Sequence, residues 1–260
     1  MAVAVPDILA RIVGHKRSTL ARESTRRADL ERRAAERAPA RHFRAALTAT
    51  GPAIISEIKQ ASPSQGVFTG DFQPASTAKL YASGGAAALS VLTDQEFFKG
   101  NLGDLEAARA AVTIPVLRKD FTIDEFHVIE AAAHGADAIL LIAAILDAAQ
   151  LRSFREIAAS YGMAALVEVH DDYELSAALD SGAEIIGVNN RNLHTFEVTL
   201  DTSLRLIEKI PAKAIKVAES GIHSRADVQR LQSAGFHAFL VGEHLMKSAD
   251  PAAALRDLRS

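Results

Sequence analysis

The chain has 260 residues, of which 48% are hydrophobic and 23% charged, and its formal net charge is −3, a balance typical of a soluble globular protein. Because cysteine is absent, a disulfide framework, a thiolate nucleophile and a cysteine-ligated metal are all excluded. No apolar run approaches the roughly 20 residues of a membrane span, and the N-terminus lacks the basic-then-apolar order of a secretory signal, so we expect a cytoplasmic protein that does not enter a membrane.

Residues 1–50 differ in charge from the rest of the chain. They contain 11 Lys and Arg against five acids, whereas the remainder carries a net charge of −9. A basic arm of this kind can bind nucleic acid. Its charges, however, alternate with apolar residues at helical spacing, beginning with Ile8, Leu9 and Ile12, which favours helices with a solvated charged face. We therefore expect a helical extension and no nucleic-acid partner.

From residue 53 onward, short runs rich in Ile, Val, Leu and Ala alternate with helical stretches. The predicted strands are 53–59, 86–93, 114–121, 136–142, 163–170, 183–190, 214–220 and 238–242. Helical periodicity lies between them, as at 105–111, 125–133 and 151–160. Eight such βα units predict an α/β protein with a (β/α)8 TIM barrel. An open, doubly wound sheet is the alternative, but no Gly-x-Gly-x-x-Gly follows the first strand. We predict one barrel domain spanning 1–260, with 1–50 as its N-terminal helical extension.

Polar side chains lie at the C-terminal ends of the predicted strands, on the faces that should point inward. They are Glu57, Lys59, Lys119, Glu168, Asn189, Arg191 and Glu219. Charged groups that end apolar strands are costly unless they meet around a polar site, and barrel enzymes carry their active sites at this end. The alternative is a structural ion-pair network, which is disfavoured because buried pairs add little net stability.

Small residues after the last two predicted strands indicate a phosphate site. Ser220 and Gly221 follow the seventh strand, and Gly242 follows the eighth. Barrels often hold a phosphate between these two loops through backbone N–H groups. Glu243 would repel an anion, so we expect its side chain to point away. The first βα loop, at 62–64, is a further source of a hydroxyl group.

The nine histidines are scattered along the chain and form no His-x-His or His-Glu-x-x-His pattern. Glu168 and His170 share one face of a predicted strand but offer only two ligands. We therefore expect no metal site.

Short motifs also follow one another in a characteristic order. They are 8–12 with Lys16, then 57–59, 62–64, 97–100, 118–121, 140–142, 167–170, 187–191, 219–221 and 241–242. Over nearly the whole chain this ordered set closely resembles the indole-3-glycerol phosphate synthase family. The resemblance implies that 1-(2-carboxyphenylamino)-1-deoxyribulose 5-phosphate is converted to indole-3-glycerol phosphate, carbon dioxide and water in tryptophan biosynthesis. The steps are ring closure, decarboxylation and dehydration.

The resemblance also implies catalytic roles. Lys119 corresponds to the general acid that protonates the carbonyl oxygen during ring closure, and Glu168 to the base of the dehydration. Lys59 would contact a substrate carboxylate or phosphate, or act as a second acid. Glu57 would orient the lysines and bind a hydroxyl. A lysine near other cations has a depressed pKa, so we expect the pKa of Lys119 to lie below its ordinary value.

The shape of that substrate implies the remaining contacts. Asn189 suits a ribulose hydroxyl, and Arg191 suits an anionic carboxylate. The residues expected to form an apolar slot for the aromatic ring are Phe98, Phe121, Leu140 and Leu193, although ordinary barrel packing explains Leu140 equally well. Ser62 and Glu219 are further expected substrate contacts, with the phosphate held by Ser220, Gly221 and Gly242. No organic cofactor or metal is implied.

Other interpretations of the sequence remain open. The barrel could instead be a phosphosugar isomerase, which would need a paired acid and base such as Cys/Asp, or a Schiff-base aldolase using Lys119. A non-catalytic binding protein, using the basic arm on nucleic acid, would show salt-sensitive binding that is lost on deleting 1–50. We expect a small phosphorylated sugar as the binding partner, and a monomer rather than a homodimer.

Overall fold

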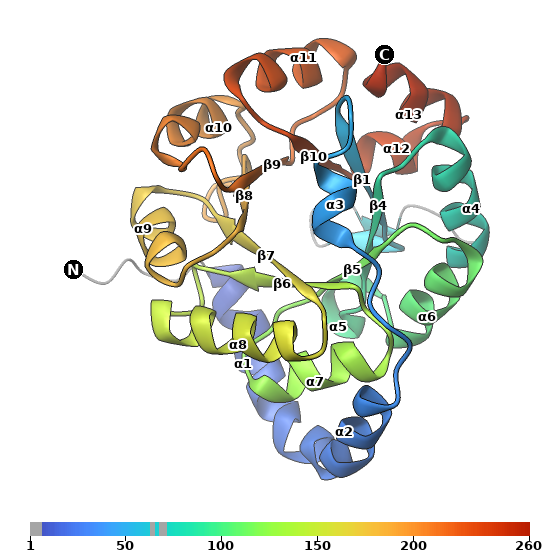
Figure 1. Cartoon of the computed structure of the whole chain (residues 1–260), viewed down its shortest axis with the longest axis vertical. Coiled ribbons are helices and arrows are strands. Elements are labelled where there is room, and N and C mark those ends of the chain that lie inside the picture. The colour runs from blue at the N-terminus through green and yellow to red at the C-terminus, as the bar shows by residue number, and fades with distance from the viewer. Residues whose placement is uncertain (1–6, 63–65, 68–71) are drawn as a thin grey trace.

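Figure 1 shows the computed structural model of the chain, which describes residues 7–62, 66–67 and 72–260. Its eight long strands are β1 (Ala53–Ile58), β4 (Ala88–Leu92), β5 (Val116–Lys119), β6 (Ala138–Ile142), β7 (Ala164–Val169), β8 (Ile185–Asn189), β9 (Ile215–Glu219) and β10 (Ala238–Val241). They are parallel and close into a barrel in the order β1-β10-β9-β8-β7-β6-β5-β4. Each strand lies within one predicted run, so the predicted TIM barrel is confirmed.

Helices follow the strands and cover the outside of the barrel (Figure 1). They are α4 (Pro74–Gly84), α5 (Gln95–Phe98), α6 (Leu102–Ala111), α7 (Glu125–Ala133), α8 (Ala148–Ser160), α9 (Asp172–Asp180), α10 (Asp201–Leu206), the 3-10 turn η2 (Ile207–Lys209), α11 (Arg225–Ala234), α12 (Glu243–Lys247) and α13 (Pro251–Arg259). Capping boxes at Asn101, Asp147 and Ser224 fix where α6, α8 and α11 begin. A two-stranded antiparallel sheet, β2 (Ala61–Ser62) with β3 (Gly66–Val67), follows β1. Of the described helices, none has the length and apolar character needed to cross a bilayer.

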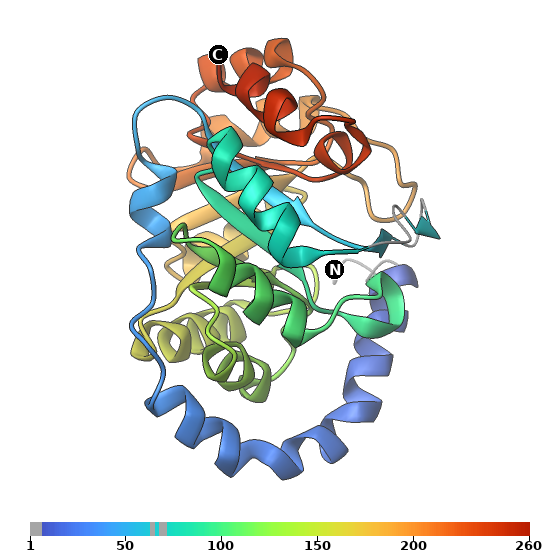
Figure 2. The same cartoon turned by 90° about the vertical axis from the view of Figure 1, so that its right-hand side faces the viewer.

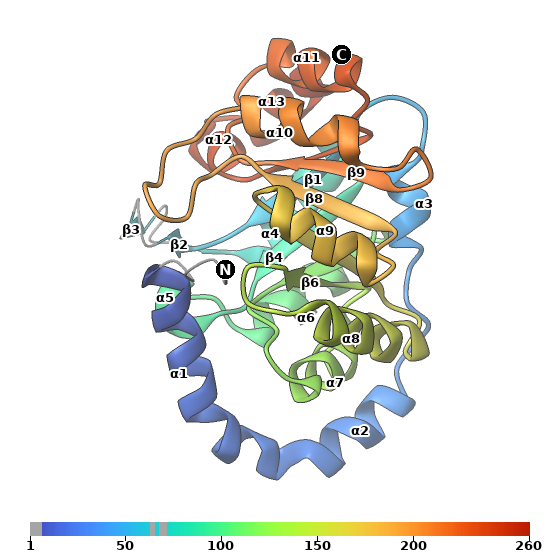
Figure 3. The same cartoon turned by 90° about the vertical axis from the view of Figure 1, so that its left-hand side faces the viewer.

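The N-terminal arm consists of α1 (Asp7–Glu23), the 3-10 turn η1 (Ser24–Arg26), α2 (Arg27–Ala35) and α3 (Phe43–Leu47). In Figures 2 and 3, α1 and α2 curve around one side of the barrel, and α3 lies at the opposite end from the first turns of α1. Leu30 and Ala34 anchor α2, because both are buried in the core between strands and helices. The predicted helical extension is therefore present.

Strand alternation divides the buried side chains between two cores. Ile54 and Ile58 face the surrounding helices, whereas Ile55 faces the barrel interior. Phe43 and Leu47 of α3 belong to the interior core, which they join from the N-terminal end of the strands. Because α3 fills that end, the open end of the barrel is the one where the strands finish in polar residues.

We expect Phe43→Ala to lower the free energy of unfolding by about 3–5 kcal/mol, because Phe43 is 1% exposed and its loss leaves a cavity inside the barrel. Leu80→Ala is the control: Leu80 is 48% exposed, so its loss should change the free energy by less than about 1 kcal/mol. Urea unfolding at neutral pH measures both variants. Equal effects would contradict the closing role of α3.

Candidate active site

Lys119 lies at the centre of a buried ionic cluster at the open end of the barrel. Its Nζ is 2.7 Å from Oε2 of Glu168 and 3.4 Å from Oε2 of Glu219. The three side chains come from β5, β7 and β9, whose parallel packing brings distant parts of the sequence together. Gly187 makes room for this cluster, because a Cβ there would lie 2.1 Å from Oε1 of Glu219.

The expectation that Lys119 has a lowered pKa is wrong. Burial alone would lower it, but the charges of Glu168, Glu219 and Glu57 outweigh burial and raise the pKa of Lys119 above its ordinary value. The expectation assumed neighbouring cations, whereas carboxyl groups from three other strands dominate its surroundings. Lys119 is therefore charged at neutral pH, and it donates a hydrogen bond to Glu168.

The two carboxyl groups beside Lys119 have very different pKa values. Burial would raise the pKa of Glu168, but Lys119 and His170 lower it to about 2. In Glu219, burial and the charge of Glu168 prevail over Lys119 and raise the pKa to about 8. At neutral pH these three residues hold one ammonium, one carboxylate and one protonated carboxyl, so the cluster of Lys119, Glu168 and Glu219 carries no net charge.

Asn189 connects this cluster to the loop after β9. Its side-chain amide donates to Oε1 of Glu168 at 3.2 Å. Its Oδ1 accepts hydrogen bonds from Oγ of Ser220 at 2.9 Å and from the backbone N–H of Arg191 at 3.0 Å. Glu168 is thus held by an ammonium on one oxygen and an amide on the other, which fixes the orientation of its carboxylate.

Lys59 and Glu57 form a second ion pair at the end of β1. Nζ of Lys59 is 2.5 Å from Oε1 of Glu57. The pair lies directly against Gly242, where a Cβ would be 2.3 Å from the Glu57 oxygen and 3.0 Å from the lysine nitrogen. Any side chain larger than that of glycine at this position after β10 would clash with the ion pair.

A cavity of about 190 Å³ extends from the ionic residues toward the arm. The four predicted slot residues line it together: Phe98, Phe121, Leu140 and Leu193. The rings of Phe98 and Phe121 lie with their centres 6.0 Å apart. Leu140 also belongs to the interior core, so both interpretations of this residue hold. We call this space the apolar cavity.

Helix α1 supplies a wall of the apolar cavity that sequence reasoning missed. Ile8, Leu9 and Ile12 all line it. Their helical spacing predicts a helix with a solvated charged face, but such a pattern does not say which surface the apolar face of the helix covers. Phe196, in the loop after β8, also lines the cavity from a left-handed backbone position with φ of 61°.

A second cavity, of about 270 Å³, lies beside the loops after β9 and β10, and we call it the loop cavity. The three predicted phosphate contacts, Ser220, Gly221 and Gly242, all line it. Ser220 and Gly221 have φ of 66° and 75°, so the chain turns sharply where β9 ends. A Cβ at Gly221 would lie 2.6 Å from Val198, which favours glycine there.

Glu243 lines both cavities rather than pointing away from them. Its carboxylate lies 2.6 Å from Nζ of Lys247 and 4.0 Å from the guanidinium of Arg191. Two cations therefore offset the charge that would repel an anion. The side chain of Ser62 and the residues 63–65 that follow it lie outside the described part of the chain, which leaves the predicted hydroxyl contact from 62–64 as a prediction.

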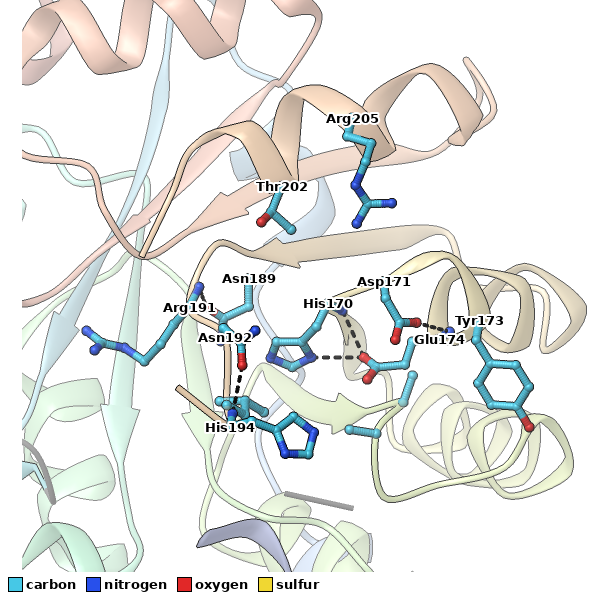
Figure 4. Close-up of a pocket in the computed structure, with 13 residues that line it drawn as sticks. His170, Asp171, Tyr173, Glu174, Asn189, Arg191, Asn192, His194, Thr202 and Arg205 are labelled. Carbon is cyan, nitrogen blue, oxygen red and sulfur yellow. Dashed lines mark hydrogen bonds and ion pairs between the residues drawn. The ribbon is translucent and has the colours of Figure 1, made fainter. Parts of the chain in front are cut away.

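His170 adds a group to which the sequence assigned no role. It borders a side pocket of about 300 Å³ shown in Figure 4. Nδ1 lies 2.9 Å from Oε2 of Glu174, and Nε2 lies 3.5 Å from Oε1 of Glu168. Burial would lower the pKa of His170, but both carboxylates raise it above its ordinary value. Across the described residues, no three His, Asp or Glu side chains are grouped so that they could hold a metal ion.

Residues 9–258 match the family described as indole-3-glycerol phosphate synthase. Curated proteins with that name include one from Albidiferax ferrireducens, 51% identical over 97% of this chain and 98% of that protein. Those from Polaromonas naphthalenivorans and Koribacter versatilis are 50% and 51% identical, covering 97% and 94% of this chain and 98% and 95% of those proteins.

Two solved structures of other enzymes share the fold at low sequence identity. A 3-hexulose-6-phosphate synthase superposes with a TM-score of 0.63 at 18% identity, covering 80% of this chain and 98% of its own. A thiamine phosphate pyrophosphorylase from Pyrococcus furiosus has a TM-score of 0.60 at 17% identity, covering 84% of this chain and 96% of its own. At these identities the likeness concerns the barrel alone.

We expect Glu219→Gln to remove a pH dependence of stability. The folded pKa of Glu219, about 8, lies above its ordinary value of 4.5, so the folded state binds this proton more tightly and stability falls as pH rises between the two values. Glutamine resembles the protonated carboxyl and does not titrate. In urea unfolding, the variant should gain stability relative to the native protein as the pH rises from about 5 to about 8, and the gain should level off above that.

The matched control is Glu184→Gln, since that carboxylate is exposed and pairs only at the surface with Arg44. A relative stability of Glu219→Gln that does not change with pH would show that Glu219 is ionised in the folded protein at neutral pH.

Proposed function

The chain belongs to the indole-3-glycerol phosphate synthase family, and we propose that Lys119 and Glu168 are the general acid and the general base of its reaction. The enzyme is a carboxy-lyase of tryptophan biosynthesis. It closes the ring of 1-(2-carboxyphenylamino)-1-deoxyribulose 5-phosphate and releases carbon dioxide and water, leaving indole-3-glycerol phosphate. The observation that carries the two roles is the buried 2.7 Å contact between Lys119 and Glu168.

The contact between Lys119 and Glu168 supports a mechanism in which proton donation by Lys119 makes Glu168 a stronger base. Ring closure requires a proton at the carbonyl oxygen while the aromatic ring attacks the carbonyl carbon. Lys119 is charged, so it carries the proton at neutral pH. Once that proton has moved to the substrate, Glu168 has lost its adjacent cation and its pKa rises. Glu168 then becomes basic enough to accept a ring proton when water is lost.

Proton balance supports a role for Lys59. With an ionised substrate carboxylate, the carbonyl oxygen and the departing hydroxyl each take one proton, and the base recovers one, so each turnover consumes one proton. Lys59 either supplies the second proton or binds the phosphate or carboxylate of the substrate. Its contact with Glu57 and its place against Gly242 support the binding role. Glu57 orients Lys59 and binds a hydroxyl.

The two cavities suit a substrate with an apolar end and an anionic end. The aromatic ring would lie in the apolar cavity, and the phosphate would accept hydrogen bonds from backbone N–H groups around Ser220, Gly221 and Gly242. Between them, Asn189 would bind a ribulose hydroxyl and Arg191 the carboxylate. Protonated Glu219 can donate to a second hydroxyl. The cavities share Lys119 and Asn189, which supports a single extended substrate.

We also propose a cytoplasmic monomer in which the arm and barrel form one domain, without a metal, an organic cofactor, nucleic acid or a membrane as partner. Ring closure and dehydration need only acid and base groups, and rearomatisation drives the decarboxylation, so no step requires a redox group. Two cations of the arm pair with acids on the barrel: Arg27 lies 2.6 Å from Glu125, and Arg33 lies 3.3 Å from Glu106.

The charge state of Lys119 also argues against the Schiff-base alternative. An aldolase needs an unprotonated lysine to attack a carbonyl. Here the surrounding carboxyl groups hold the proton on Lys119, which favours the acid role. After borohydride treatment in the presence of substrate, the mass of the protein should therefore be unchanged, whereas an imine would be trapped as a covalent adduct.

We expect Lys119→Ala to reduce turnover about a thousandfold or more while the protein stays folded, because the proton donor for ring closure is lost. The assay is the growth of indole fluorescence with purified protein, substrate and excess chelator. The native enzyme should give a rise that survives the chelator.

Lys216→Ala is the matched control, since Lys216 also lies on a barrel strand but alternates with the inward-facing Ile215 and Val217. Near-native turnover in Lys119→Ala would remove Lys119 as the acid. Absence of a rise with folded native protein would instead reject the synthase reaction.

We expect Glu168→Gln to slow dehydration more than ring closure. Glutamine can still accept a hydrogen bond from Lys119 but cannot take up the ring proton. Rapid quenching and analysis of bound species should show the ring-closed, decarboxylated intermediate accumulating in the variant. Slowed ring closure without that intermediate would reverse the assignment and make Glu168 part of the acid step.

A further inference from the structure

Lys16 of α1 forms a buried ion-pair cluster outside the residues assigned to the reaction. Its Nζ lies 2.6 Å from Oδ1 of Asp120 and 3.2 Å from Oδ2 of Asp94. The lysine side chain is 13% exposed, and the two carboxylates are 4% and 2% exposed. Charges buried to this degree are costly unless each meets its partner. The contact therefore fixes where α1 can lie.

Asp120 connects this contact to the strand that carries Lys119. Its Oδ1 accepts a hydrogen bond from the backbone N–H of Phe121 at 2.7 Å. Its Oδ2 accepts from Oγ1 of Thr93 at 2.6 Å and from the guanidinium of Arg118 at 3.1 Å. Lys16 thus binds a carboxylate that also fixes the backbone of Phe121, a wall of the apolar cavity.

Asp94 connects the same lysine to a second wall. Its Oδ1 caps α5 by accepting from the backbone N–H of Phe97 at 2.8 Å, and α5 carries Phe98. Figures 2 and 3 show the first turns of α1 beside α5, and the rings of His15 and Phe97 meet edge to face with centres 5.9 Å apart.

The third wall belongs to α1 itself. Lys16 lies one helical turn after Ile12 and two turns after Leu9, so the three share a face. Leu9 and Ile12 line the apolar cavity and are 3% and 1% exposed. A displacement of Lys16 from its carboxylates would therefore move the apolar wall with it.

The charge balance of this cluster makes displacement of α1 from the barrel energetically unfavourable. The buried acids of this cluster are Asp94, Asp120 and Glu130, and its buried cations are Lys16 and Arg118. Arg26, which is half exposed, adds a contact to Glu130 at 3.3 Å. Removing Lys16 would leave three buried carboxylates with one buried cation. Burial would lower the pKa of Lys16, but Asp120 and Asp94 raise it above its ordinary value, in agreement with a stable pair.

We propose that Lys16 is a positioning residue for substrate binding, which holds α1, Phe98 and Phe121 together as three walls around the aromatic end of the substrate. The proposal rests on the function proposed above, in that the apolar cavity takes the aromatic ring. Lys16 touches none of Lys119, Glu168 or Glu219 in this arrangement. Its loss should therefore weaken binding of the substrate more than it slows the chemical steps.

The experiment compares Lys16→Met with Arg27→Met, a control on the same arm whose ion pair with Glu125 is about half exposed on both sides. In Lys16→Met we expect KM for 1-(2-carboxyphenylamino)-1-deoxyribulose 5-phosphate to rise about tenfold or more and kcat to change less than about threefold. Arg27→Met should leave both constants within about twofold of the native values. A lysine that only stabilises the fold would lower the melting temperature and leave KM unchanged, and that result overturns the proposal.

Hydrogen exchange of the substrate-free protein provides a second measurement, independent of turnover. Backbone amides of 7–16 should exchange faster in Lys16→Met than in the native protein, and those of 27–35 should not. If backbone amides of 7–16 exchange at the same rate in Lys16→Met as in the native protein, Lys16 does not hold α1 in place. This result overturns the proposal whatever reaction the enzyme catalyses. If native protein makes no indole product but exchange in 7–16 rises as expected, the assigned reaction fails and the docking role of Lys16 stands.

Lys16→Gln covers the case in which Lys16→Met folds poorly, because glutamine can still donate to Asp120 without the charge. We expect an intermediate rise in KM and an intermediate exchange rate. A loss of kcat with unchanged KM in this variant would place Lys16 in the chemistry and overturn the positioning role.

Discussion

The buried contact between Lys119 and Glu168 is the interaction on which the rest of the site depends. Burying two opposite charges is favourable only where further groups form hydrogen bonds to them. Asn189 holds the second oxygen of Glu168, and Glu219 remains protonated beside them. Glycine at 187 leaves space for that second carboxyl. The cluster is neutral as a whole, so a closed barrel of apolar strands can enclose it.

The architecture of this site could be predicted because it follows from strand alternation. Ile55 and Glu57, or Leu166 and Glu168, differ by two positions, so the inward face of each strand was visible in the sequence. Parallel strands all end on the same side, which places the polar ends together. The barrel and the convergence of the lysines and glutamates followed from those two rules, without any knowledge of which strand neighbours which.

The sign of the Lys119 pKa shift could not be predicted in this way. It depends on which side chains lie within a few ångströms across the barrel, and strand alternation gives a face but no distance. The role of α1 was missed for a related reason. Ile8, Leu9 and Ile12 are apolar at helical spacing, yet such a pattern shows only that one face is buried. That the buried face borders the active site depends on Lys16 meeting Asp94 and Asp120, residues far from it in sequence.

The end of β5 shows how the two ion-pair clusters stay separate although they are adjacent in the chain. Lys119 points into the barrel, so its neighbours Arg118 and Asp120 must point outward. Both outward side chains belong to the cluster that holds α1. Three consecutive charged residues therefore serve two sites, and Asp120, directly after β5, borders the apolar cavity as well as binding Lys16. Because β5 and the residue directly after it carry both sets, the backbone fixes the position of the arm relative to the catalytic lysine.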